Sequence, residues 1–283
     1  EFHERLEVKD APPVLSARVK ADMMRRMLGL GAGQEVLDLG CGAGKFALYA
    51  GENGRASGVD VAPFFLPRAV ARVDLVLGDL RRLPFRKQAF PRAYSLDVLE
   101  HLDEEGVREV LLEARRTLST DGRLFVYTHA MESSRLAGFQ RFVNRIAKRL
   151  GRAGLVDQER EALRKSDHRN AIRSHQHFDA LSAAAGLEVV ERRYYNVVFK
   201  AVIEDLLLRL LEQWGRKRGA AKAGPQPPAE PGSQRRIGAP PPGRLALALA
   251  QALTWLLKLD VVLFGGIRTG PFFGLLRPRA TKQ

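Results

Sequence analysis

Residues 36–46 read VLDLGCGAGKF. An apolar run is interrupted by Asp38 and enters three glycines spaced two apart, Gly40, Gly42 and Gly44. Glycine adopts backbone conformations that other residues avoid, and its missing side chain lets a ligand approach the chain closely. The stretch therefore predicts a strand followed by a ligand-binding turn, as found at the edge of open α/β sheets.

Three ligand classes suit such a turn: a nicotinamide dinucleotide, a nucleotide phosphate and a sulfonium cofactor. The dinucleotide fingerprint G-x-G-x-x-G requires a third glycine where this chain has Lys45. The phosphate-binding P-loop requires a hydroxyl residue after Gly-Lys, and the chain has Phe46 there. Both phosphate interpretations are therefore weakened.

The surrounding pattern predicts an α/β fold. Short apolar runs alternate with helical stretches from about residue 15 to 196, which favours a parallel sheet covered on both faces. Asp60 ends the second expected strand and Asp79 follows the third, so both should lie with Asp38 at the carboxyl edge of the sheet. A crevice that holds several acids and no arginine suits a cationic cofactor. The expected strands are 35–39, 56–60, 73–77, 93–97, 123–128 and 187–195.

Four stretches, in this order and spacing, resemble the class I methyltransferases that use S-adenosyl-L-methionine (SAM): VLDLGCGAG, GVDVAP, GDLRRLPF and LDVLEHLDEEGVREVLLEARRTLSTDGRLFVYT. The chain is most similar to the small-molecule branch that includes quinone-ring methyltransferases. The resemblance covers about residues 15–195. It implies a Rossmann-like, seven-stranded, mostly parallel sheet with helices on both faces and one reversed edge strand, at residues 272–277. The family usually has an acid just before the fourth strand, where this chain has Pro91 and Arg92, so a different local turn is expected.

The resemblance also implies SAM as the cofactor and assigns nine residues to it. Those around the methionine part of SAM are Asp38, Gly40, Gly42, Gly44, Ser95 and Leu96; Asp60 would hold the ribose hydroxyls, and Asp79 with Leu80 the adenine.

Two histidines are candidates for the catalytic base that a hydroxyl or carbon acceptor needs. His101 follows the fourth strand and His129 ends the fifth. His101 is equally compatible with a structural role at the entry to the next helix.

The segment SDHRNAIRSHQHF holds the candidate substrate residues His168, Arg169 and Arg173. The two arginines suit an anionic acceptor, or form a solvated basic loop. Three histidines lie within ten residues here, His168, His175 and His177, but no thiolate and no i, i+4 pair accompanies them, and we predict no metal site.

The C-terminal third differs from the rest of the chain in its pattern of apolar and charged residues. We expect residues 1–197 and 266–283 to form the methyltransferase domain and residues 198–265 to form an apolar helical insertion, with a disordered linker at about 216–243. The net charge is +14, and residues 216–283 hold twelve Lys or Arg against Glu230 and Asp260. Such charge favours anionic partners.

Three placements of the apolar stretch at 245–264 remain open. It can span a membrane, lie in the membrane interface, or pack with residues 198–214 as a lid over the sheet. Spanning is opposed by Lys258 and Asp260, which each cost about 2.5–3.5 kcal/mol near the bilayer centre.

The sequence thus predicts a SAM-dependent methyltransferase that acts by O- or C-methylation on a small hydrophobic or lipid-linked acceptor. One alternative is an RNA methyltransferase that binds nucleic acid through its basic C-terminal region, although SLDVLEHL differs from the Asn-Pro-Pro-aromatic motif used on base nitrogens. Another is a SAM-binding protein without turnover. A single cysteine, Cys41, and no visible signal peptide predict a cytoplasmic protein, with peripheral contact at the inner face of the membrane.

Overall fold

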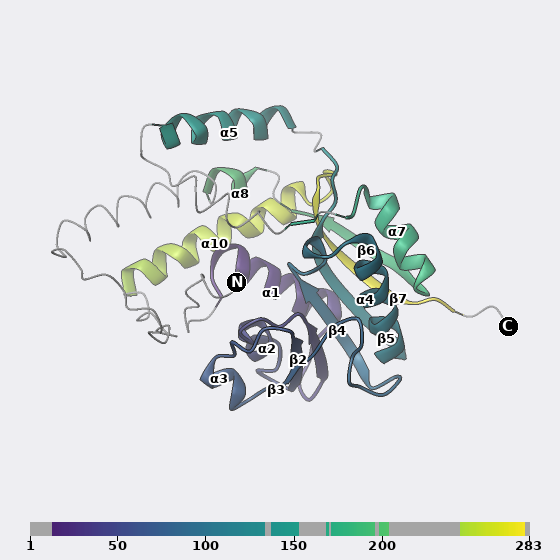
Figure 1. Ribbon diagram of the computed structural model, residues 1–283. Coiled ribbons are helices and arrows are strands. Elements are labelled where there is room, and N and C mark those ends of the chain that lie inside the picture. Colours follow the sequence, from purple (N-terminus) through teal and green to yellow (C-terminus); the bar gives the residue numbers. More distant parts are fainter. Residues whose placement is uncertain are drawn as a thin grey trace, which may run out of the picture.

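The computed structural model describes residues 13–133, 137–152, 168–169, 171–195, 198–203 and 244–280 (Figure 1). Its strands are β1 (Glu35–Leu39), β2 (Arg55–Asp60), β3 (Asp74–Leu77), β4 (Phe90–Leu96), β5 (Leu118–His129), β6 (Leu187–Tyr194) and β7 (Pro271–Pro278). They form one sheet in the order β3-β2-β1-β4-β5-β7-β6. All pairings are parallel except those of β7, which runs antiparallel to β5 and β6. This confirms the expected seven-stranded sheet and the reversed direction of the strand expected at 272–277. Its expected place at the edge was wrong, because β7 lies between β5 and β6, and β6 forms the edge.

Helices lie on both faces of the sheet, as expected (Figure 1). Their bounds are α1 (Leu15–Leu28), α2 (Lys45–Ala50), α3 (Pro67–Val70), α4 (Glu104–Thr117), α5 (Ala137–Arg152), α7 (His175–Ala184), α8 (Phe199–Val202) and α10 (Arg244–Phe264), with a 3₁₀ turn η2 at Leu99–His101. Helix α5 is a segment that the sequence interpretation did not single out. The expected linker at 216–243 lies outside the described residues.

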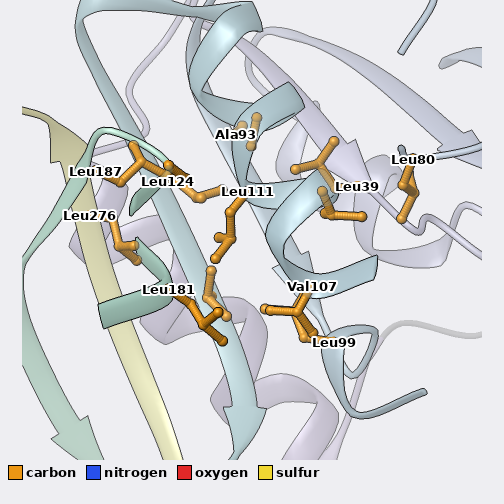
Figure 2. Close-up of a cluster of buried hydrophobic side chains, with 14 of the residues drawn as sticks. Leu39, Leu80, Ala93, Leu99, Val107, Leu111, Leu124, Leu181, Leu187 and Leu276 are labelled. Atoms are coloured by element: carbon orange, nitrogen blue, oxygen red, sulfur yellow. The ribbon is translucent and has the colours of Figure 1, made fainter. Parts of the chain in front are cut away.

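Successive side chains of the central strands point to opposite faces of the sheet and so build two cores. On one face, Leu39 and Leu124 pack against Leu111 of α4 and Leu181 of α7 (Figure 2). The second core lies under α1, α2 and α10 and contains a group of aromatic side chains from the strands. These are Tyr94, Phe125, Tyr127 and Phe273, with Tyr195 just after β6.

Pro91 and Arg92 lie inside β4 and not in a turn before it. The pairing of β4 with β5 shifts register between Phe90 and Arg92, where proline offers no amide for the ladder. The Arg92 Nε donates to the carbonyl of Leu28, at 2.9 Å. The departure from the family pattern therefore produces an irregular strand start that is tied to the end of α1.

Helix α10 is attached to the domain through its polar residues. The Thr254 hydroxyl oxygen accepts a hydrogen bond from the Leu15 amide, at 2.8 Å, at the start of α1. The Lys258 ammonium lies 2.7 Å from a carboxylate oxygen of Asp22, on the same helix α1. Thr254 and Lys258 thus contact protein, whereas Gln251 of the same helix is exposed.

Asp260 connects α10 to α8. It is buried, and one of its carboxylate oxygens accepts from the amides of Val198 and Phe199, both at 2.9 Å. These amides stand at the start of α8, where backbone donors lack helical partners. An acid in this apolar helix is therefore structural. No helix in the described part of the chain is both long and apolar enough to cross a bilayer.

Candidate active site

The glycine turn follows β1, and its three glycines have left-handed backbone conformations, with φ of +84° at Gly40, +51° at Gly42 and +81° at Gly44. A Cβ at Gly40 would stand 2.4 Å from a methyl carbon of Val98, and one at Gly44 would stand 2.6 Å from the Ala69 Cβ. A Cβ at Gly42 would meet no atom within 4 Å. Gly42 is therefore the position where the turn faces open space and a ligand can reach its backbone.

Asp60, the last residue of β2, braces this turn from the next strand. One carboxylate oxygen accepts from the Gly42 amide at 2.7 Å, and the other from the Ala62 amide at 2.9 Å. Each oxygen keeps a second lone pair. The carboxylate is thereby fixed beside the open face of the turn with capacity for two further donors, as a ribose diol would require.

Asp38 lies behind the turn and is only 2% exposed. It accepts a hydrogen bond from the Tyr94 hydroxyl at 2.8 Å. Burial raises the pKa of Asp38 to about 8; the bond from Tyr94 opposes the rise, and the charge of Asp60 adds to it. At neutral pH this carboxyl is mostly protonated, and a cation placed nearby would favour its ionised form.

The contacts of Asp79 and Ser95 support their predicted cofactor roles less directly. The Asp79 carboxylate pairs with the guanidinium of Arg81, the shortest distance being 2.7 Å, and this bond lowers its pKa. An adenine amine would have to share that carboxylate with Arg81. Ser95 is buried and donates to the Leu39 carbonyl at 3.2 Å. Leu80 and Leu96 are buried beside these residues, and the cofactor roles of all four remain predictions.

Both candidate bases lie near one buried acid that the sequence analysis did not single out. Glu100, in η2, is 2% exposed. One of its carboxylate oxygens lies 3.4 Å from the Nδ1 of His129, and the other accepts from the Thr128 hydroxyl at 3.1 Å. His101 is the next residue along the chain. In the sequence, Glu100 could have been noticed from its place in LEHL. Helices often begin with an acidic residue, however, so a glutamate at this position did not by itself indicate a buried side chain.

His168 joins this group from a distant part of the chain. Its ring stands edge-on to that of His101, with centroids 4.8 Å apart, and its centroid is 6.5 Å from that of His129. The structure therefore brings together three of the predicted site residues. Within the described ranges, ligand atoms of Glu100, His101 and His168 also lie within 4.8 Å of one another, a spacing compatible with a metal ion.

The two arginines expected to meet substrate face the start of α4. Arg169 lies 3.0 Å from the Asp103 carboxylate, and Arg173 pairs with Glu104. Each guanidinium is exposed and already has an acidic partner. An anionic acceptor would have to compete for them.

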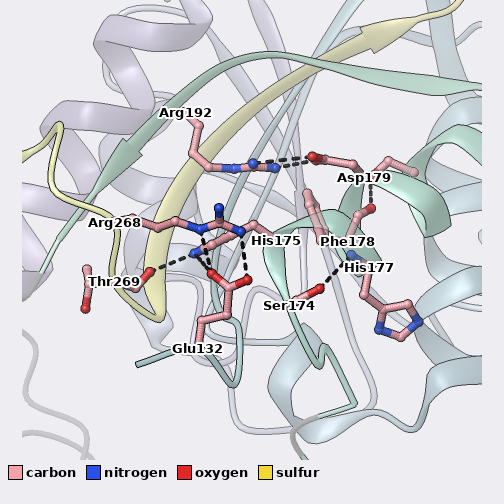
Figure 3. Close-up of polar contacts among 10 residues, drawn as sticks. Glu132, Ser174, His175, His177, Phe178, Asp179, Arg192, Arg268 and Thr269 are labelled. Carbon is pink, nitrogen blue, oxygen red and sulfur yellow. Dashed lines mark hydrogen bonds and ion pairs between the residues drawn. The ribbon is translucent and has the colours of Figure 1, made fainter. Parts of the chain in front are cut away.

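His175 and His177 do not converge with His168. The buried His175 ring is bonded through Nε2 to the Thr269 carbonyl, at 2.8 Å, and burial lowers its pKa (Figure 3). The carboxylate of Glu132 lies 3.5 Å from the same nitrogen and pairs with Arg268. His177 lies in the first turn of α7, and its amide donates to the hydroxyl of Ser174, the residue that caps this helix (Figure 3). These two histidines support the fold around β7 and α7.

Comparison with known proteins assigns the domain. Residues 36–122, from the glycine turn to the start of β5, match the family model described as a methyltransferase domain. The crystal structure of the (4+2)-cyclase SpnF has the same fold, with a TM-score of 0.54 and 15% identity over 99% of this chain and 90% of that one. Residues 36–122 thus match a methyltransferase domain, and the sheet has the fold of that solved structure.

Two curated relatives match the methyltransferase domain over part of their own length. A Talaromyces variabilis protein named S-adenosyl-L-methionine-dependent Diels-Alderase iccD is 28% identical over 194 residues, which are 67% of this chain and 58% of that protein. A Mus musculus protein named Probable tRNA methyltransferase 9B is 32% identical over 102 residues, 35% of this chain and 23% of that protein.

SAM is the cofactor that the sequence resemblance implies, and the residues present fit it. The open face of Gly42 admits a ligand beside the backbone, and Asp60 stands there with free acceptor capacity. Asp38 supplies a buried acid that a positive charge would ionise. These carboxylates would not attract a pyrophosphate or any other anion.

Proposed function

We propose that the chain is a SAM-dependent methyltransferase that transfers a methyl group to an oxygen or carbon atom of a small hydrophobic or lipid-linked acceptor. The observation that carries the proposal is the hydrogen bond between Asp60 and the Gly42 amide at the carboxyl edge of the sheet. It forms a ready ribose site beside an open glycine. The domain match supports the same ligand.

When bound, SAM supplies an electrophilic methyl group on a positively charged sulfur. Methyl transfer is an in-line displacement, so much of the acceleration comes from holding donor and acceptor at the attacking distance. The glycine turn and Asp60 would orient the donor. His129, at the end of β5, would take the proton of a hydroxyl or of an enolisable carbon.

A hydrophobic acceptor is supported by the outer face of α10. Most of the residues that this helix presents to solvent are apolar, whereas Thr254, Lys258 and Asp260 contact protein. The exposed residues are Ala248, Leu249, Gln251, Ala252, Trp255, Leu256, Leu259, Val262 and Leu263. Trp255 is 69% exposed and Val262 71%. A helix with an exposed side that is mostly apolar is suited to lie in a membrane interface.

Charge complements this apolar face. Helix α5 contacts α8, which in turn contacts α10, and it carries Arg141, Arg145 and Arg149 four residues apart, all exposed. Such a row is attracted to acidic lipid headgroups. We therefore propose peripheral contact with an anionic membrane through α10 and α5, which would place the active site near a lipid-linked acceptor.

Two exposed valines provide a matched test of the membrane contact. Val262→Asp places a charge on the outer face of α10, and Val70→Asp places one on α3, where the valine is 62% exposed. We expect the first variant to lose at least about tenfold in affinity for phosphatidylcholine–phosphatidylserine vesicles, because a buried charge opposes insertion. The second should bind as wild type does. Equal binding by both variants in a sedimentation assay would contradict the proposed face.

The alternatives rest on particular relatives. The name of the mouse protein refers to tRNA, and with the net charge of +14 it favours RNA as a second acceptor class. The names of the Talaromyces protein and of SpnF refer to cyclisation, which favours a SAM-binding protein that does not transfer methyl groups.

One incubation distinguishes these functions. The protein is mixed with methyl-labelled SAM and a cell extract, which is then separated into lipid, small-molecule, RNA and protein fractions. We expect label in the lipid or small-molecule fraction and none with Asp60→Asn. Label in RNA would support the second acceptor class, and no label despite SAM binding would support the protein without turnover.

A further inference from the structure

We infer that Glu100 is a positioning residue for His129, which it holds as a base with Nε2 directed away from the core. The inference rests on the proposed methyl transfer and names the group that removes the acceptor proton. The contact between the Glu100 carboxylate and the Nδ1 of His129 favours His129 as that base.

The burial of Glu100 requires an explanation. An ionised carboxylate away from water is costly unless it is paired and hydrogen-bonded. Glu100 is held on three sides: by Thr128 through one side-chain oxygen, by His129 near the other, and by the Arg169 amide, which donates to its backbone carbonyl at 2.8 Å. Burial acts to raise the pKa of Glu100, but the interaction with His129 outweighs it and holds the pKa below its usual value. The carboxylate is therefore ionised and directed at His129.

The orientation of the His129 ring follows from the same contacts. Its Nδ1 is buried, forms no hydrogen bond among the described residues, and lies 3.4 Å from a Glu100 oxygen, whereas the side chain as a whole is 34% exposed. The exposed part of the side chain therefore lies on atoms other than Nδ1. Tyr127 stands edge-on to the ring, with centroids 5.5 Å apart, and limits its rotation.

A carboxylate beside Nδ1 favours the tautomer with the proton on that nitrogen, which leaves the lone pair on Nε2. The same pairing of a buried acid with a histidine orients the base in serine proteases. In methyl transfer to a hydroxyl, the acceptor oxygen gives its proton to Nε2 and forms a bond to the methyl carbon. The carbon–sulfur bond breaks, and its electron pair stays on sulfur. Glu100 stabilises the imidazolium that results.

The tautomer of His129 is the first test, and it does not depend on a known acceptor. Long-range proton–nitrogen spectra of the full chain labelled with ¹⁵N-histidine report the position of the proton, with His129→Gln used for assignment. We expect the Nδ1–H form in wild type and a loss of that preference in Glu100→Gln. Glu100→Asp should restore part of it. A wild-type ring protonated on Nε2 would overturn the inference.

The second test uses the acceptor fraction labelled by methyl transfer. We expect Glu100→Gln to lower kcat by about 100-fold, the lower part of the range for acid–base groups, with KM unchanged. Glu100→Asp should recover part of the loss, and His177→Gln, a histidine outside the cluster, should behave as wild type. Full activity of Glu100→Gln would refute the positioning role and leave the methyltransferase intact.

Metal binding is the competing explanation, because Glu100 also lies near His101 and His168. Dialysis against a chelator followed by Co²⁺ or Zn²⁺ separates the two. The inference predicts unchanged histidine spectra and unchanged transfer after chelation. Loss of transfer on chelation and its return with the cation would assign Glu100 to a metal and overturn the inference. A correct tautomer with no methylated product would refute the proposed function alone.

Discussion

At the scale of single residues, the glycines of the turn have different reasons for being glycine. Gly40 and Gly44 are surrounded by side chains, and Gly42 is open. All three adopt left-handed backbone, which costs another residue about 1 kcal/mol. The space around each glycine therefore indicates whether that glycine is needed for folding or for ligand binding.

A pair of alanine substitutions tests this difference. Gly40→Ala should lower the free energy of unfolding by more than about 2 kcal/mol, because its Cβ would overlap Val98 as well as strain the backbone. Gly42→Ala should cost about 1 kcal/mol, the backbone strain alone, yet lose SAM affinity because the new methyl group occupies the ligand's approach. Urea denaturation and calorimetry measure the two effects. A stable Gly42→Ala that binds SAM normally would place the cofactor elsewhere.

The buried acid Asp38 makes stability depend on pH. Its pKa rises from 3.8 to about 8 in the folded chain, so folding favours the protonated form. This contribution is complete below about pH 4 and is lost as the pH rises through about 8, by up to about 1.4 kcal/mol per pH unit. Asp38→Asn should remove the slope, so that it gains stability relative to wild type between pH 5 and pH 8. Parallel urea denaturation curves with the same pH dependence would contradict this.

Sequence reasoning at this scale gave the position of a residue where that position follows from its place on a strand. Asp60 was expected at the end of β2, and the structure places it there, against Gly42; its role at the cofactor remains a prediction. Asp79 was predicted in the same way, but its pairing with Arg81 depends on a local turn that strand counting does not describe. Glu100 was missed because its burial comes from Thr128 and His129, which are nearly thirty residues away in the sequence.

At the scale of elements, apolar periodicity predicted all seven strands, since it marks which segments are buried. It could not predict which side of α10 faces the protein. The sequence analysis named Lys258 and Asp260 as obstacles to crossing a membrane, and the structure turns both inward, to α1 and α8. Helix α5 was not singled out in the sequence.

The attachment of α10 can be tested at Asp260. Asp260→Ala leaves the amides of Val198 and Phe199 without their buried acceptor, and hydrogen bonds to a charged group contribute about 1.5–3 kcal/mol. We expect a loss of that size in the free energy of unfolding. Asp74→Ala, which removes an exposed acid from β3, should change it by less than about 0.5 kcal/mol. Equal effects in urea denaturation would mean that Asp260 does not anchor α8.

At the scale of the whole molecule, the chain combines a sheet at whose carboxyl edge we propose cofactor binding with a helix, α10, whose exposed residues are mostly apolar. The fold and its cofactor were predictable because four motifs occur in register along the sheet. The acceptor was not, because its choice depends on how α5, α8 and α10 meet, and no short motif encodes that arrangement.

The central claim is that SAM binds at the glycine turn through Asp60, and calorimetric titration of the full chain with SAM tests it most directly. Asp60→Asn keeps the shape of the side chain but removes its charge and one acceptor, and Asp74→Asn makes the same change at an exposed site on the neighbouring strand. We predict binding by wild type and by Asp74→Asn, and a loss of at least about 100-fold in Asp60→Asn, equivalent to about 2.7 kcal/mol. Unchanged affinity in Asp60→Asn, or no binding of SAM to wild type, would contradict the claim.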